Sequence, residues 1–261
     1  MSQQASDRVR ITHIGGPTIL VEIGQFRILT DPTFDPAGSQ YERTMKYIDP
    51  ALSVSEVGPV DVALVSHDQH PDNLDEAGRA SLSQARHVLT TPAGASRLGN
   101  GARGMEKWES IELVGTDGRR VHITAVPAHH GPEEVLGMLG DVNGWIVEWE
   151  GARHGALYVS GDTVFFDGLR EIPRRYPVAV AVLHFGAAQT SVYGPVHLTL
   201  TATDGVQMAQ ALGEAIIIPI HFEGWAHYTE GRTQIEQAFR AAGLEKRLRF
   251  LPLGQPVALD A

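Results

Sequence analysis

Histidine and aspartate are concentrated in one short run, residues 66–75, which reads Ser-His-Asp-Gln-His-Pro-Asp-Asn-Leu-Asp. The run directly follows the apolar residues 62–65, so a buried strand should end where the imidazoles and carboxylates begin. Neutral imidazole and carboxylate are the ligands that borderline divalent metals such as zinc prefer. The run therefore favours a metal site with His67 and His70 as ligands. The alternative is a polar loop in which Asp72 or Asn73 caps a helix.

Later in the chain, further ligand-type residues end apolar, strand-like segments: His129 and His130, Asp162, and His221. In α/β proteins, strand ends deliver such side chains to one edge of a sheet, where sites are built. The repeated placement predicts that these residues join the His-rich run at one site.

The order of these motifs resembles the metallo-β-lactamase fold superfamily: a His-rich motif, a lone His, Gly-Asp-Thr and a late His. The likeness is closest to the branch of ascorbate-phosphate lactonase-like and related metal-dependent hydrolases. The segments 11–23 and 26–32 are similar to that branch's first hairpin and Asp-Pro turn. The resemblance implies an α/β (α+β) fold, a four-layer αββα sandwich with two mixed sheets. It also implies that residues 1–261 form a single metallo-β-lactamase-like domain.

The resemblance implies the metal ligands as well: His67, His70, Asp72, His130, Asp162 and His221. Asp162 matches the bridging carboxylate, with helix capping as its alternative role. His130 is preferred over His129 because the family places its histidine at this distance after Val-Pro-Ala. His129 would then be a gate or a hydrogen-bond donor behind the ligands. We predict that His67, His70 and His130 converge on one ion.

The chain departs from the family motif His-x-His-x-Asp-His in two places. Gln69 is an inserted residue when both ends of the motif are aligned, and Asn73 stands where the third histidine belongs. The neutral amide oxygen of asparagine is a poor zinc ligand. The expected cofactor is therefore Zn2+, as one or two ions, with a weaker second subsite that tolerates Mn2+ or Fe2+. His184 ends another apolar run and is either a replacement ligand, a pocket residue or a structural histidine.

This ligand set predicts a metal-dependent hydrolase that uses a metal-bound hydroxide to cleave a small ester, lactone or phosphoester. Asp72 would hold the hydroxide in line, and His129 or His184 would protonate the leaving group. His197 and His227 are weaker pocket candidates. The alternatives are a metal-binding pseudo-enzyme, motivated by Asn73, and a di-iron redox enzyme on the same fold.

The composition narrows the class of protein. A chain of 261 residues with 43% hydrophobic content can bury one large core. Its 21 basic and 31 acidic residues give a net charge of −10, which argues against a nucleic-acid surface. Because there are no cysteines, disulfides and thiolate ligands are excluded. Residues 1–7 are polar and contain no signal sequence, and no apolar run is long enough to cross a membrane. We expect a cytoplasmic enzyme with a small-molecule substrate.

Apolar runs of strand length lie at 8–14, 17–23, 26–30, 61–66, 87–91, 120–127, 144–149, 155–160, 178–184, 215–220 and 248–252. Helical periodicity appears near 73–84, 164–175, 199–213 and 231–243. Residues 99–104 match G-x-G-x-x-G but follow a turn and short helix, whereas a dinucleotide site needs the motif after a strand. A turn is therefore expected there.

Overall fold

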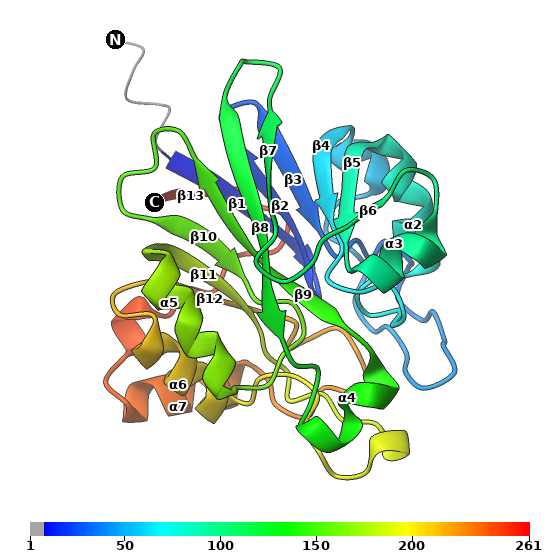
Figure 1. Ribbon diagram of the computed structural model, residues 1–261. Helices are drawn as coiled ribbons and strands as arrows, with labels where there is room; N and C mark the ends of the chain where they lie inside the picture. The colour runs from blue at the N-terminus through cyan, green and yellow to red at the C-terminus, as the bar shows by residue number, and fades with distance from the viewer. Residues whose placement is uncertain (1–7) are drawn as a thin grey trace.

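The computed structural model describes residues 8–261, and two mixed β-sheets form its centre (Figure 1). The first sheet has the strand order β13-β1-β2-β3-β4-β5-β6, and the second has the order β12-β11-β10-β9-β8-β7. In both sheets, antiparallel pairs occupy one part and parallel pairs the other. The sheets therefore have the same mixed organisation.

The strands of the first sheet are β1 (Arg8–Gly15), β2 (Thr18–Ile23), β3 (Phe26–Thr30), β4 (Val60–Leu64), β5 (Ala85–Thr90), β6 (Arg103–Gly104) and β13 (Val257–Asp260). Those of the second are β7 (Ser110–Val114), β8 (Arg120–Ala128), β9 (Val142–Trp149), β10 (Ala156–Val159), β11 (Val178–His184) and β12 (Ile216–Ile220).

The main core lies between the two sheets. Alternate residues of a strand point to opposite faces, so each strand contributes to two layers. In β2, Ile19 and Val21 join the cluster that also contains Trp145 and Val182 of the second sheet. Leu20, between them, packs in a separate cluster on the other face of the first sheet. Burial on both faces explains why these strands read as continuous apolar runs.

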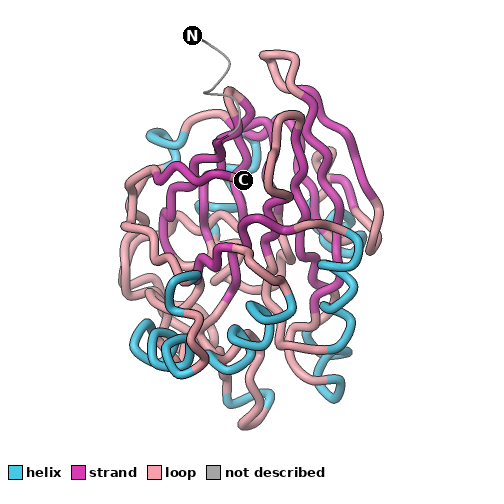
Figure 2. Tube along the Cα trace, turned by 90° about the vertical axis from the view of Figure 1, so that its left-hand side faces the viewer, coloured by secondary structure: helices cyan, strands magenta, loops and turns pink. Residues whose placement is uncertain are grey.

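Helices cover the outer faces, as Figure 1 and the side view of Figure 2 show. Val57 of α1 and Ala77 of α2 pack outside the first sheet. Met208 of α6 and Phe239 of α7 pack outside the second. The helices are α1 (Val54–Val57), α2 (Glu76–Ser81), α3 (Pro92–Leu98), α4 (Glu133–Leu139), α5 (Glu171–Arg175), α6 (Ala202–Ala211) and α7 (Arg232–Ala241). Short 3-10 turns are η1 (Leu82–Gln84), η2 (Asp167–Arg170), η3 (Ser191–Tyr193) and η4 (Glu245–Arg247). The predicted αββα sandwich of two mixed sheets is confirmed.

One strand prediction is wrong. Residues 248–252 form no strand, and Leu248 makes only an isolated bridge to Ile217. Leu248 and Phe250 instead pack as apolar side chains against the outer cluster of the second sheet, so their hydrophobicity reflects burial and not pairing. The last strand is β13, which pairs with β1. The segment 99–104 follows α3, which ends at Leu98. Its first residues form the expected turn, and its last two form the short strand β6.

Within residues 8–261, no helix is both long enough and apolar enough to cross a membrane. Residues 1–7, from which the lack of a signal sequence was predicted, lie outside the described residues.

Candidate metal centre

The candidate ligands lie in loops that follow the C-terminal ends of four strands. His67 and His70 follow β4, His130 follows β8, Asp162 follows β10 and His221 follows β12. The first two come from the first sheet and the other three from the second. The structure thus brings the residues of four separate sequence motifs to one edge of the sandwich.

Three imidazoles form the first ligand group, in which the ring nitrogens of His67, His70 and His130 lie within 4.8 Å of one another. His70 Nδ1 is 2.9 Å from His67 Nε2 and 3.0 Å from His130 Nε2. His130 Nδ1 lies 2.8 Å from the carbonyl oxygen of Leu198, to which it must donate, so Nε2 of the neutral ring carries a lone pair. The ring nitrogens of three imidazoles thus converge, and the Nε2 lone pair of His130 is among them. This donor set fits a divalent metal ion.

The first group is also held in the protonation state that metals require. Burial lowers the pKa of His67 well below its ordinary value. Burial, with the neighbouring His130, lowers the pKa of His70 to about 4. Both rings are therefore neutral at physiological pH, which is the form of imidazole that binds a metal.

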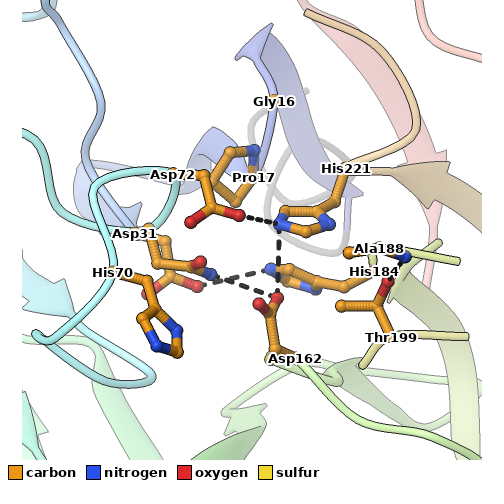
Figure 3. A network of polar contacts seen from close by, with 12 residues as sticks. Gly16, Pro17, Asp31, His70, Asp72, Asp162, His184, Ala188, Thr199 and His221 are labelled. Atoms are coloured by element: carbon orange, nitrogen blue, oxygen red, sulfur yellow. Dashed lines mark hydrogen bonds and ion pairs between the residues drawn. The ribbon is translucent and has the colours of Figure 1, made fainter. Parts of the chain in front are cut away.

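The second ligand group contains Asp72, Asp162 and His221, all buried and again within 4.8 Å of one another. His221 Nδ1 donates to the carbonyl oxygen of Phe185 at 3.1 Å, so Nε2 of a neutral ring has a lone pair. This nitrogen faces Asp72 Oδ2 at 3.2 Å and Asp162 Oδ1 at 3.5 Å (Figure 3). Two carboxylates and one lone pair point at the same space, and only a cation or a proton can relieve their repulsion.

The electrostatics of the second group reflect this repulsion. Burial disfavours the charged form of His221, but Asp162 and Asp72 outweigh it and raise the pKa of the ring to about 9. Burial likewise disfavours the charged carboxylates, yet the surrounding imidazoles hold the pKa values of Asp72 and Asp162 below their usual range. The metal-free site therefore retains one proton that a metal ion would displace.

Asp162 faces both groups. Its Oδ1 is 3.5 Å from His221 Nε2, and its Oδ2 is 3.7 Å from His130 Nε2. Oδ2 is buried and has no hydrogen-bond partner among the described residues. The next helical turn, η2, begins after Phe166 without a side-chain cap, so Asp162 does not cap it. An orphaned carboxylate oxygen between two ligand groups fits a shared metal ligand.

Asn73, which replaces the family's third histidine, is fully buried beside Asp162. Its Nδ2 donates to Asp162 Oδ1 at 3.1 Å, while its own Oδ1 has no hydrogen-bond partner in the described structure. The asparagine thus donates to a candidate ligand.

The structure does not bring His129 and His184 into either ligand group. The ring of His129 stacks on Phe166, with centroids 3.7 Å apart. His184 is fully buried, with Nε2 3.3 Å from Asp31 Oδ2 and Nδ1 3.2 Å from Ser160 Oγ. Proton transfer by these two residues stays a prediction, and their surroundings do not favour it.

A pocket of about 670 Å³ opens over the two groups and exposes His70, Asp72 and His130 at its floor. Leu139 of α4 and Leu198 form an apolar side of this pocket. Residues 41–44, in the segment between β3 and α1, also line the pocket. The remaining lining residues are Asp68, Gln69, Pro71, Leu74, Asp75, Glu76, Arg79, Gly137, Met138, Gly140, Ala188, Thr190, Tyr193 and His227.

Comparison with protein families gives a match to the beta-lactamase superfamily domain over residues 26–222. The chain belongs to the beta-lactamase superfamily. This superfamily member is 30% identical to a metal-dependent hydrolase of Opitutus terrae over 225 residues, which cover 82% of this chain and 85% of the relative.

Two solved structures share the fold of this superfamily member. An isothiocyanate hydrolase from Delia radicum gut bacteria has a TM-score of 0.82 and 20% identity, covering 97% of this chain and 100% of the other. A possible metal-dependent hydrolase from Veillonella parvula has a TM-score of 0.81 and 23% identity, covering 96% and 99%. The predicted family is confirmed.

The sequence analysis named His227 only as a weaker pocket candidate. The residue lies in the loop after β12, six positions beyond His221, and lines the pocket. Its Nε2 is 2.9 Å from Asp72 Oδ2. No strand end precedes it, and its spacing from a ligand-bearing strand was the only available signal.

Proposed function

We propose that this chain is a metal-dependent hydrolase that cleaves a small ester, lactone or phosphoester with an activated water molecule. The observation that carries the proposal is the convergence of two groups of imidazole and carboxylate ligands at the floor of one pocket, with Asp162 facing both. The family and the hydrolase name of the relative from Opitutus terrae support the same reaction class.

In this proposal, each ligand group holds one divalent ion, and Asp162 is shared between the ions. His67, His70 and His130 would hold the first ion, which we propose to be zinc because all three ligands are imidazoles. Asp72 and His221 complete the second group with Asp162. That group is richer in oxygen and would accept manganese or iron as well as zinc.

A zinc ion bound there supplies a water molecule that ionises near pH 7 and a Lewis acid for the substrate oxygen. The protein supplies the geometry. Asp72 lies at the pocket floor, where its carboxylate can accept a proton and orient the attacking oxygen. Leu139 and Leu198 give the pocket apolar surface, while Glu76 and Arg79 are among its charged lining residues. This combination suits a small molecule with apolar and polar parts.

We also propose that residues 1–261 act as one domain and that the enzyme works in the cytoplasm, on a small molecule and without nucleic acid or membrane as a partner. The net charge of −10 supports the exclusion of nucleic acid.

The test is metal analysis of protein purified without added metal, followed by a hydrolysis screen of lactones, carboxylic esters and phosphodiesters with the metal-loaded enzyme. We expect up to two ions per chain and hydrolysis in at least one substrate class, which His130→Phe abolishes. His122→Phe, a change at an exposed histidine, is the control. A protein that takes up no metal would contradict the proposal and favour the pseudo-enzyme. Tightly bound iron without hydrolysis would contradict it in favour of a redox enzyme.

A further inference from the structure

His227 connects the second ligand group to the pocket wall. Its Nδ1 lies 2.6 Å from Thr44 Oγ1, and its Nε2 lies 2.9 Å from Asp72 Oδ2. The side chain is only 9% exposed. One ring therefore joins a candidate metal ligand to the segment 36–50, which contributes residues 41–44 to the pocket.

The partners of His227 determine its tautomer. A carboxylate only accepts hydrogen bonds, so Nε2 must carry the hydrogen and donate it to Asp72. In the neutral ring, Nδ1 is then an acceptor, and the hydroxyl of Thr44 donates to it. The chain of donors runs in one direction, from Thr44 through His227 to Asp72. A ring whose Nε2 carries hydrogen has no lone pair there for a metal, and His227 belongs to neither ligand group.

The backbone around His227 holds the ring in place. The backbone N–H of Gln189 donates to the carbonyl oxygen of His227 at 3.0 Å, and the N–H of Ala226 donates to that of Met45 at 3.0 Å. The second of these bonds ties the His227 loop directly to the segment 36–50. The ring also makes an edge contact with Trp225, with centroids 6.4 Å apart.

The hydrogen bond selects one oxygen of Asp72. Oδ2, which accepts from His227, is also the oxygen that lies 3.2 Å from His221 Nε2. The donor thus fixes the carboxylate in the orientation that completes the second ligand group. This matters more here than in the family motif, because Asn73 removes one nitrogen ligand and leaves the second ion to Asp72, Asp162 and His221.

We propose that His227 is a positioning residue for the second metal ion: its Nε2–H orients Asp72, and Thr44 fixes its tautomer. This inference rests on the proposed function in that it requires an ion at Asp72. It assigns to the 36–50 segment a second task besides lining the pocket, because Thr44 belongs to that segment. A displacement of Thr44 by a bound substrate would therefore alter the orientation of Asp72 and the affinity for the second ion.

The experiment is a calorimetric titration of the metal-free protein with Zn2+, which resolves the two affinities without any substrate. His227→Phe keeps a ring but removes the donor, and His227→Gln places an N–H near the position of Nε2. Thr44→Val removes the hydroxyl while keeping the side-chain shape. His197→Phe is the matched control, because the imidazole of His197 contacts Gln189 and not a carboxylate.

We expect His227→Phe to weaken only the second affinity, by about 10–100-fold, as is typical when a partner of a metal ligand is removed. His227→Gln should stay within a few-fold of the original protein, Thr44→Val should give a smaller loss, and His197→Phe should change neither affinity. Visible spectra of the Co2+ forms should show the same selective change.

Equal second affinities in His227→Phe and the unchanged protein would overturn the inference. Equal losses in His227→Gln and His227→Phe would also overturn it, because His227 would then be a ligand or a packing residue. If the unchanged protein binds one ion only, the inference fails while the proposed hydrolase stands. If it binds none, the proposed function fails as well.

Discussion

Asn73 donates a hydrogen bond from Nδ2 to Oδ1 of Asp162, at 3.1 Å, from the position where the family motif has a metal-binding histidine. In our proposal, the substitution replaces a ligand by a donor to a ligand. Asp162 Oδ1 is held in place by this bond, whereas Asp162 Oδ2 has no hydrogen-bond partner among the described residues. A nitrogen ligand lost at the proposed second subsite would thus be accompanied by a firmer orientation of the proposed shared carboxylate.

Restoring the histidine should strengthen the second subsite. We expect Asn73→His to raise the second zinc affinity measured by calorimetry, because an imidazole nitrogen is a better zinc ligand than an amide oxygen. Asn73→Ala is the control, since it removes the donor without adding a ligand and should not raise the affinity. Two equally tight zinc sites in the unchanged protein would contradict this prediction, because another side chain would then have replaced the missing histidine.

Replacing Asp162 should affect both ions. We expect Asp162→Ala to weaken both zinc affinities, by at least about 10–100-fold, because its two oxygens face different ligand groups. Asp167→Ala, at an almost fully exposed carboxylate at the start of η2, serves as the control. Metal content after dialysis provides the measurement. Retention of both ions, with a loss of only about 1 kcal/mol in unfolding free energy, would instead identify a structural aspartate.

The two ligand groups should respond differently to pH. Because the pKa of His70 is lowered to about 4, this ligand of the first ion stays neutral and should lose no proton when zinc binds between roughly pH 5.5 and 8. The pKa of His221 is raised to about 9, so the second ion must displace a proton. Its affinity should therefore rise about tenfold per pH unit up to that value.

The same shift at His221 affects the stability of the metal-free protein. Its pKa in the folded state lies above the ordinary value of 6.5, so the proton stabilises the fold below pH 6.5. This contribution is lost as the pH rises through about 9. Calorimetric zinc titrations in buffers of different ionisation enthalpy count the protons that are released when the second ion binds. Release of no proton on binding the second ion would contradict the assignment.

A buried ion pair supports the segment that carries Thr44. Lys46 Nζ lies 3.2 Å from Asp75 Oδ2, and both side chains are almost completely buried. Lys46→Met should lower the unfolding free energy by about 3–5 kcal/mol, because it leaves the carboxylate of Asp75 buried without its cation. Arg174→Met breaks an exposed pair with Glu171 and should cost about 0–1 kcal/mol. Urea denaturation measures both, and similar costs for the two variants would refute the prediction.

The ligand-bearing strand ends were predictable because their signal is local. An apolar run that ends in His or Asp can be recognised from a few neighbouring residues, and this rule indicated His67, His130, Asp162 and His221, while the family motif indicated Asp72. The same rule also singled out His184 at the end of β11, which lies in neither ligand group. Asp31, at φ 36° in the loop after β3, lies against the ring of His184, and nothing near His184 in the sequence indicates this neighbour.

The contact of His227 and the pairing of β13 could not be predicted from local sequence. The contact of His227 with Asp72 spans 155 positions, and β13 pairs with the first strand of the chain, so neither relationship leaves a local pattern. Both depend on how the two sheets and their loops come together. Sequence reasoning therefore indicated the candidate ligands and named His227 only as a weaker pocket candidate, without its contact to Asp72.

Each ligand group draws side chains from loops of both sheets: His67 and His70 meet His130, and Asp72 meets Asp162 and His221. An ion in either group would thus cross-link the loops of the two sheets. Separation of the sheets would first have to break coordinate bonds. Release of the ions and loss of the fold would then share one kinetic barrier, and a chelator would shorten the lifetime of the folded enzyme as well as remove its metal.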